Sequence, residues 1–338
     1  MVSKRNVSIQ LIRAVAMFMI IFDHLLLRIE FPMKSIVLQI CNSGVFIFLL
    51  ISGFLYGNKK IENWKRWFVN RIVKICVPMW LFMVIDFIVE ALLWNYFDIK
   101  MVLVYAFNLQ GIFGVNIAGA SLWFLTLIMI CYLITPLLQW VKQKDFNRNV
   151  GIAAIITGII VQIVLAYTTD IGMVAGHTLS WCVIAIGMYV IGYFWGNLIL
   201  SDNTKKGHIA IVTVLMIISS GVVLLFNTMY DGQIIYDRIV IFYGMIVIDF
   251  WICIVLYKLG QYVNSKWIRN VINNLDVISY EFYIVHELLI LSITLNVLKN
   301  NGVVAYMLST LVLSYVTAVI FHKICGCIIN CVLTYKKH

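Results

Sequence analysis

Two ionisable residues, Arg13 and His24, stand eleven positions apart within the first long apolar run of the sequence. An α-helix turns by about 100° per residue, so the two share one face to within about 20°, about 16 Å apart along the axis. A charged side chain near the centre of a membrane helix costs about 2.5–3.5 kcal/mol and therefore needs a reason. In one interpretation the pair lines a cavity, with His24 as a general base and Arg13 facing negative charge. In the other, each side chain reaches toward its own membrane interface. The spacing alone leaves both interpretations open.

A second polar group comprises Ser279, Tyr283 and His286, with Glu287 beside them. Offsets of four and seven residues keep the first three within about 40° on one helix face. This face is expected to meet protein or water rather than lipid. It could form the opposite wall of the same cavity, or it could join neighbouring helices through hydrogen bonds.

Several acids could pair with these groups. Asp86 and Asp249 fall inside apolar runs and could pair with the arginine or with a histidine. Asp23 is adjacent to His24 but lies about 100° around the helix from it. An acid from another position, such as Asp86 or Glu287, is therefore the better candidate for orienting the His24 ring.

The strongest basic cluster includes Arg66, Arg71 and Lys74, which precede Pro78 on a helix that enters the membrane. Arg71 and Lys74 are three residues apart and lie on one helical face. The cluster could attract anionic lipid headgroups. It could instead hold a phosphorylated cytosolic cofactor.

The elements that must position these residues are membrane spans. Of the 338 residues, 63% are hydrophobic and 12% are charged, whereas a soluble domain is about 45–50% apolar and about 25% charged. We therefore predict an all-α polytopic membrane bundle that forms a single domain over 1–338. The net charge of +10 is attributed to cytoplasmic loops rather than to nucleic-acid binding. The eight cysteines show neither zinc nor disulfide spacing, and no metal is expected.

Apolar runs of about 20 residues, the length that crosses a bilayer, predict ten spans. Their approximate ranges are 9–27, 36–57, 72–94, 121–141, 150–168, 179–199, 208–226, 239–257, 278–298 and 303–333. The flanking segments divide Lys and Arg unequally between the two sides, 18 against 5. Since cytoplasmic loops are enriched in these residues, both termini and the connection 58–71 are predicted to be cytoplasmic. Segment 98–119 is predicted to be an outer loop that dips into the interface or the protein.

Five blocks of the sequence, in this order, resemble the membrane acyltransferase-3 family. The blocks are Arg13-X10-His24; Ser43-Gly44-Val45-Phe46-Ile47-Phe48 running to Ser52-Gly53-Phe54; Arg71-Ile72-Val73-Lys74 before Pro78; Leu122-Trp123-Phe124-Leu125 with Tyr132 and Pro136; and Ser279-Tyr280 with Tyr283 and His286. Lys74 departs from the family's Arg-X-X-Arg pattern, and an ammonium lacks the planar fork that suits phosphate. The SGNH-type hydrolase domain that some members carry is not found in these residues.

The resemblance implies O- or N-acylation, usually acetylation, with acetyl-CoA or another acyl-CoA as donor. It implies that His24 is the general base and that Arg13 positions the donor or its developing negative charge. Tyr283 and His286 would then form the opposite wall and donate hydrogen bonds to the acceptor or the oxyanion.

The same resemblance gives Arg66, Arg71 and Lys74 a role in binding the phosphates of CoA. The expected partners are the acyl-CoA, a hydroxyl acceptor on a surface glycan, lipid-linked sugar or small molecule, and the lipid bilayer of a bacterial cell membrane. Neither the acceptor nor the oligomeric state follows from the sequence. The alternative function is a transporter or flippase without catalysis, for which ten helices with buried charges are equally natural.

Overall fold

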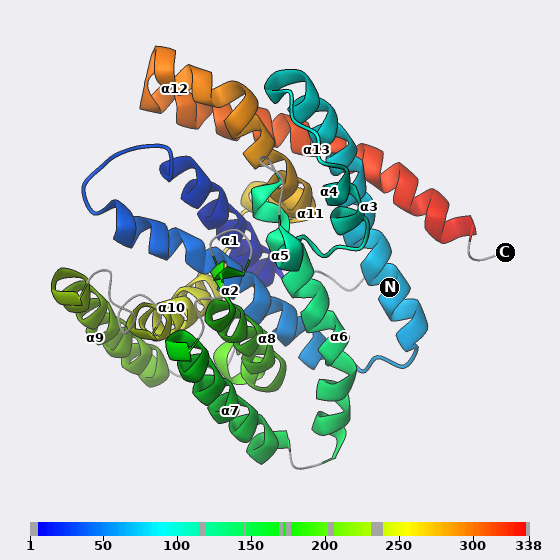
Figure 1. Cartoon of the computed structure of the whole chain (residues 1–338). Helices are drawn as coiled ribbons and strands as arrows, with labels where there is room; N and C mark the ends of the chain where they lie inside the picture. The colour runs from blue at the N-terminus through cyan, green and yellow to red at the C-terminus, as the bar shows by residue number, and fades with distance from the viewer. Residues whose placement is uncertain are drawn as a thin grey trace.

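The computed structural model describes residues 6–114, 119–144, 147–168, 172–173, 177–201, 206–230 and 239–335. Within these residues, ten helical segments are long and apolar enough to cross a membrane, which confirms the predicted number of spans and the all-α class (Figure 1). The helices are α1 (Val7–Leu26), α2 (Lys34–Gly57), α3 (Trp64–Trp94), α4 (Ile99–Ala106), α5 (Gln110–Phe113), α6 (Trp123–Gln143), α7 (Asn147–Thr168), α8 (Leu179–Ile199), α9 (Lys206–Tyr230), α10 (Ile241–Gln261), α11 (Lys266–Leu289), α12 (Leu295–Asn301) and α13 (Val303–Tyr335). The cytoplasmic placement of the termini stays a prediction.

Two helices begin well before the start that hydropathy predicts for their spans, whereas the other starts differ by only a few residues. The predicted third span begins at residue 72, but α3 begins at Trp64, directly after Asn63, whose side chain accepts a hydrogen bond from the backbone N–H of Arg66. The predicted ninth span begins at residue 278, but α11 begins at Lys266, after a Ser265 cap. Hydropathy marks only the apolar length of a helix, whereas a capping side chain extends the helix into polar sequence. The basic cluster before the third span is therefore helical.

The ninth span is composite. Helix α11 continues through a π-helical turn, Ile290–Thr294, into α12. Such turns interrupt the regular ladder of backbone hydrogen bonds and often stand beside functional sites. Here the π-helical turn begins at Ile290, within one helical turn of His286 and Glu287 near the end of α11.

Helix α1 lies inside the bundle, where it contacts α2, α10 and α11 (Figure 1). Four of its side chains are completely buried: Ile12, Met17, Ile21 and Leu25. This central position is what allows the polar residues of α1 to face protein rather than lipid.

Helices α2 and α8 pack against each other through two Gly-x-x-x-Gly motifs. Gly53 and Gly57 of α2 lie against the backbone of α8, and a Cβ atom on Gly53 would run into the Tyr189 carbonyl. Gly192 of α8 in turn lies against the backbone of α2. Small residues at this spacing let two membrane helices approach until their backbones touch. The α2–α8 pair therefore forms a rigid support behind one side of the site.

The described part of segment 98–119 folds into the protein, as expected for a loop that dips. The Gln110 side chain donates to the Asn108 side chain (2.8 Å) and to the Leu122 carbonyl (2.9 Å). Thr126 donates to the Asn108 carbonyl (2.8 Å) and accepts from the Gly111 backbone N–H (2.9 Å). These hydrogen bonds tie the segment to the start of α6 and to the turn directly before it.

The other helices lie at the periphery. Helix α9 packs on α10, where Trp251 donates to Thr213 (3.1 Å) and Ser219 donates to the Gly244 carbonyl (2.9 Å). A two-residue antiparallel pair, β1 (Gly172–Met173) and β2 (His177–Thr178), precedes α8. Figure 1 shows α7 and α9 toward one edge of the bundle and α12 toward another, away from the central helices.

Candidate active site

A cavity of about 250 Å³ lies among α1, α2, α3, α6 and α11. We call it the main cavity, and its lining consists of Arg13, Ile20, Phe48, Ser52, Leu55, Tyr56, Arg71, Ile75, Phe124, Leu125, Ile128, Tyr132, Ser279, Tyr280 and Tyr283. Its lining is mostly apolar and aromatic, and within the described part of the chain its charged members are two arginines. Such a space suits a slender ligand with a negatively charged end.

A second, smaller space of about 30 Å³ lies further along α1. We call it the His24 chamber, and its lining consists of Ile20, Asp23, His24, Asn42, Val45, Ser121, Trp123, Phe124 and Tyr283. A water molecule needs about 10–15 Å³ of such volume, so the chamber has room for about two. Polar residues from four segments of the chain line this small volume.

Three residues, Ile20, Phe124 and Tyr283, line both spaces and therefore lie at the boundary between them, which we call the constriction. The order along α1 is Arg13, then Ile20, then His24, at about 1.5 Å per residue. The structure thus places Arg13 in the wall of the main cavity and His24 in the wall of the chamber beyond the constriction. The shared helix face foreseen from the spacing runs along both spaces.

Arg13 is held by an acid that sequence reasoning missed. Its guanidinium lies 2.7 Å from Asp276 of α11, not against Asp86 or Asp249. Gln10 extends the network, because its side-chain amide lies 3.4 Å from the other oxygen of Asp276. The spacing of residues could have indicated this acid. Asp276 stands seven residues before Tyr283, about two helical turns, and so lies on the same face of α11 as the polar stripe.

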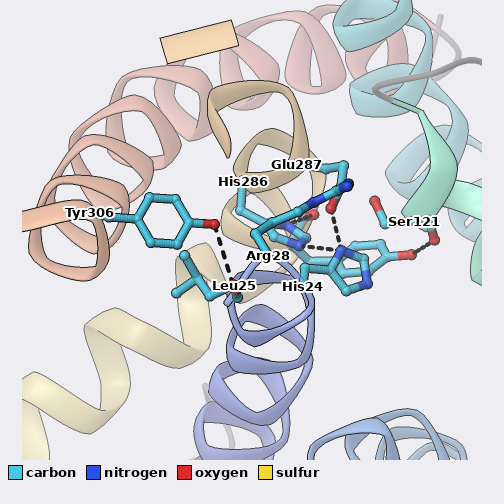
Figure 2. Close-up of polar contacts among 8 residues, drawn as sticks. His24, Leu25, Arg28, Ser121, His286, Glu287 and Tyr306 are labelled. Atoms are coloured by element: carbon cyan, nitrogen blue, oxygen red, sulfur yellow. Dashed lines mark hydrogen bonds and ion pairs between the residues drawn. The ribbon is translucent and has the colours of Figure 1, made fainter. Parts of the chain in front are cut away.

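One nitrogen of the His24 ring contacts two side chains of α11, as Figure 2 shows. Its Nδ1 contacts a carboxylate oxygen of Glu287 and lies 3.1 Å from Nε2 of His286. The other oxygen of Glu287 lies 3.4 Å from the Arg28 guanidinium. Glu287 is thus the acid that orients the His24 ring, one of the two candidates considered from the sequence.

The hydrogen-bond partners assign the tautomer of both rings. His286 Nδ1 lies 2.6 Å from the Tyr283 carbonyl, which can only accept, so the proton of His286 is on Nδ1 and its Nε2 accepts. Both neighbours of His24 Nδ1 are therefore acceptors, and the proton of the neutral His24 ring is on Nδ1. This leaves Nε2 with a free lone pair, and Figure 2 shows it pointing away from Glu287 and His286. A carboxylate–imidazole pair in this tautomer is the arrangement of a general base.

The structure revises the expected places of Tyr283 and His286. His286 is fully buried and lines neither space, because its ring lies behind that of His24, with ring centroids 4.9 Å apart. It supports His24 instead of forming the opposite wall. Tyr283 does face both spaces, but its hydroxyl donates to the Ser121 carbonyl. It would have to exchange that partner to donate to a ligand.

Of the three predicted phosphate-binding cations, Arg71 lines the main cavity. Its guanidinium lies 5.6 Å from the centre of the Tyr56 ring, and its Nε is buried without a hydrogen-bond partner among the described residues. Arg66 and Lys74 are exposed and outside the lining. The cavity meets only the stripe of α3 that carries Arg71 and Ile75, one helical turn apart, while Lys74 points about 60° away from Arg71.

The ligand atoms of His24, His286 and Glu287 lie within 4.8 Å of one another and by chemical type could hold a metal ion. The same atoms are already joined by direct hydrogen bonds. An ion would have to replace those bonds and would occupy Nδ1 of His24. In the structure, hydrogen bonds join the three side chains without an ion. The expected absence of a metal stays a prediction.

A membrane bundle that buries a carboxylate–histidine base at the end of a cavity with two arginines has the features of an enzyme whose substrates meet within the bilayer. A model of the acyltransferase-3 family, described as an acyltransferase domain, matches residues 6–322. The chain therefore belongs to this family and is a multi-pass membrane acyltransferase. Searches of curated proteins and of solved structures gave no significant match.

Proposed function

We propose that the protein transfers a short acyl group, acetyl above all, from acyl-CoA to a hydroxyl of a surface glycan, a lipid-linked sugar or a small molecule. The observation that carries the proposal is the position of the Glu287–His24 pair, beyond the constriction at the end of the main cavity. The family match supports acyl transfer. We place this reaction in the plasma membrane of a bacterium.

The donor enters the main cavity from the end that carries Arg71. Within the described residues, Nε of the Arg71 guanidinium is buried without a hydrogen-bond partner. It is suited to a phosphate group, since charge-assisted hydrogen bonds to phosphate are among the strongest in proteins. Arg66 and Lys74 lie outside the cavity, where they would meet phosphates that stay at its rim. The thin arm of CoA follows the apolar lining, and the thioester reaches the constriction.

Arg13 acts on the donor rather than on the reacting carbonyl. It stands about 16 Å from His24 along the axis of α1, which puts its guanidinium out of direct reach of an oxyanion at His24. Its ion pair with Asp276, whose side chain is 1% exposed, fixes the guanidinium in the cavity wall. From there it can hold the polar arm or the phosphates of CoA.

The chemistry takes place at the constriction. His24 Nε2 removes the proton from the acceptor hydroxyl as its oxygen attacks the thioester carbonyl carbon. Glu287 stabilises the imidazolium that forms, and Tyr283 donates to the oxyanion after releasing the Ser121 carbonyl. The carbon–sulfur bond then breaks, the CoA thiolate takes the proton from His24, and the ester remains on the acceptor.

The test compares His24→Ala with His322→Ala in purified protein reconstituted in lipid nanodiscs. His322 is a matched control, because it also pairs with a buried glutamate of α11, Glu281, at 2.9 Å. Loss of a general base costs about 10²–10⁴-fold, so His24→Ala should lose release of CoA from labelled acetyl-CoA, while His322→Ala should keep it. Near-normal turnover by folded His24→Ala would overturn the assignment of the base. A wild-type protein that consumes no acyl-CoA with hydroxyl acceptors from an envelope extract would favour transport instead.

A further inference from the structure

The constriction between the two spaces is formed largely by apolar side chains. Ile20 of α1 is 4% exposed and lines both spaces. Phe124 of α6 also lines both spaces and stands in a cluster of rings, with its centroid 5.9 Å from that of Tyr283 and 6.4 Å from that of Phe48. These contacts hold Phe124 from two sides, so the width of the passage is set by packed groups.

The space beyond the constriction suits a hydroxyl better than a hydrocarbon chain. The His24 chamber measures about 30 Å³, which is about two water molecules. Asp23, Asn42 and Ser121 contribute polar groups to its lining, beside His24 itself. An aliphatic chain placed there would remove these groups from water without giving them partners, which is unfavourable.

The main cavity, on the other side of the constriction, has no room for a longer acyl chain while the donor is bound. On the proposed function, the arm of the donor fills the main cavity up to the thioester. The acyl group must then lie at the constriction, because the reacting atoms have to approach to about 3–3.5 Å. A chain longer than acetyl can extend neither into the chamber, which receives the acceptor hydroxyl, nor back into the occupied cavity.

We propose that Ile20 and Phe124 form an acyl-length filter, which admits the methyl of an acetyl group and rejects longer chains. The inference rests on the proposed function and adds the residues that set donor specificity. One methylene in an apolar pocket changes discrimination by about 10–200-fold. Wild-type protein should therefore use propionyl-CoA about 10–200-fold less efficiently than acetyl-CoA, and butyryl-CoA still less.

The experiment measures CoA thiol release from acetyl-, propionyl- and butyryl-CoA by protein in nanodiscs, with water and with methyl glucoside as acceptors. Ile20→Ala and Phe124→Leu each widen the constriction and should raise the propionyl-to-acetyl ratio of kcat/KM at least about tenfold. Leu55→Ala is the matched control, because Leu55 also lines the main cavity but does not line the chamber. It should change the KM of all donors alike and leave the ratio at its wild-type value.

Three results would overturn the acyl-length filter, and a fourth would overturn the proposed function itself. Wild-type protein that uses butyryl-CoA as well as acetyl-CoA overturns the filter, and this donor series needs no substitution. A wild-type propionyl-to-acetyl ratio in both folded variants overturns the filter as well, as does an equal rise of this ratio in Leu55→Ala. If the wild-type protein releases CoA from none of the donors, the proposed function itself fails, which is a different result from acetyl-CoA turnover with unchanged ratios.

Discussion

Replacing Glu287 by glutamine separates the charge of this residue from its size. Glu287 is 4% exposed and contacts Nδ1 of His24, so its interaction is little weakened by solvent. Hydrogen bonds to charged groups contribute about 1.5–3 kcal/mol, and about 1.36 kcal/mol corresponds to a tenfold change in rate. Glu287→Gln should therefore lower kcat about 10- to 150-fold. The Arg28 contact adds little, because the arginine side chain is 39% exposed.

The assay is CoA release at saturating acetyl-CoA, with the donor KM measured in parallel. Glu287 lies outside the lining of the main cavity, so the donor KM should stay near its wild-type value. Glu281→Gln is the control, since Glu281 is a buried glutamate on the same helix, paired with His322 instead of His24. It should retain its kcat. Wild-type kcat in a folded Glu287→Gln protein, or an equal loss in Glu281→Gln, would refute the role of the carboxylate.

Four further predictions follow from the same geometry. Arg71→Ala should raise the KM for acetyl-CoA, and the effect should depend on salt, because salt screens the attraction between a cation and the phosphates. Lys74→Ala should have the smaller effect, and an unchanged KM in the double variant would exclude a phosphate role for both. Arg13→Lys should keep the charge beside its acid but lose the guanidinium fork, which predicts impaired donor use, and normal use would argue against positioning by Arg13. In a cysteine-free background, an impermeant thiol reagent added outside intact cells should label Lys100→Cys and spare Lys59→Cys; the reverse pattern would contradict the predicted orientation. Treatment with EDTA should leave CoA release unchanged, whereas a loss restored by added zinc would indicate a metal at the histidine pair.

The number and order of the helices could be predicted from the sequence because each membrane span leaves a continuous apolar run in it. A run of about 20 apolar residues is both necessary and nearly sufficient for a span. Helix starts were less accessible: α3 begins at Trp64 rather than near residue 72, since a capping Asn63 continues the helix through polar residues. The predicted dip of segment 98–119 was recognisable from its amides and glycines.

The partners of the site residues could be predicted only in part. Periodicity placed Arg13 and His24 on one face, but it could not say which helix supplies each acid. Asp276 and Glu287 both come from α11, because that helix runs beside α1 over its length. The Gly-x-x-x-Gly motifs of α2 and α8 are visible in the sequence, yet their pairing depends on the three-dimensional arrangement.

The order of groups along the three central helices explains why the site has two ends. Along α1, Arg13 comes first, then Ile20 at the constriction, then His24. Along α11, Ser279 and Tyr283 precede Glu287. Helix α6 runs the other way, so its residues that line the chamber precede those that line only the main cavity. With the predicted orientation, the arginines face the cytoplasm, where acyl-CoA is made, and the base lies toward the outer side. A constriction that passes an acyl group but not CoA would let the two substrates remain on opposite sides. Under that arrangement the membrane-spanning fold is itself part of the mechanism, because it separates donor and acceptor and joins them only at the reacting carbonyl.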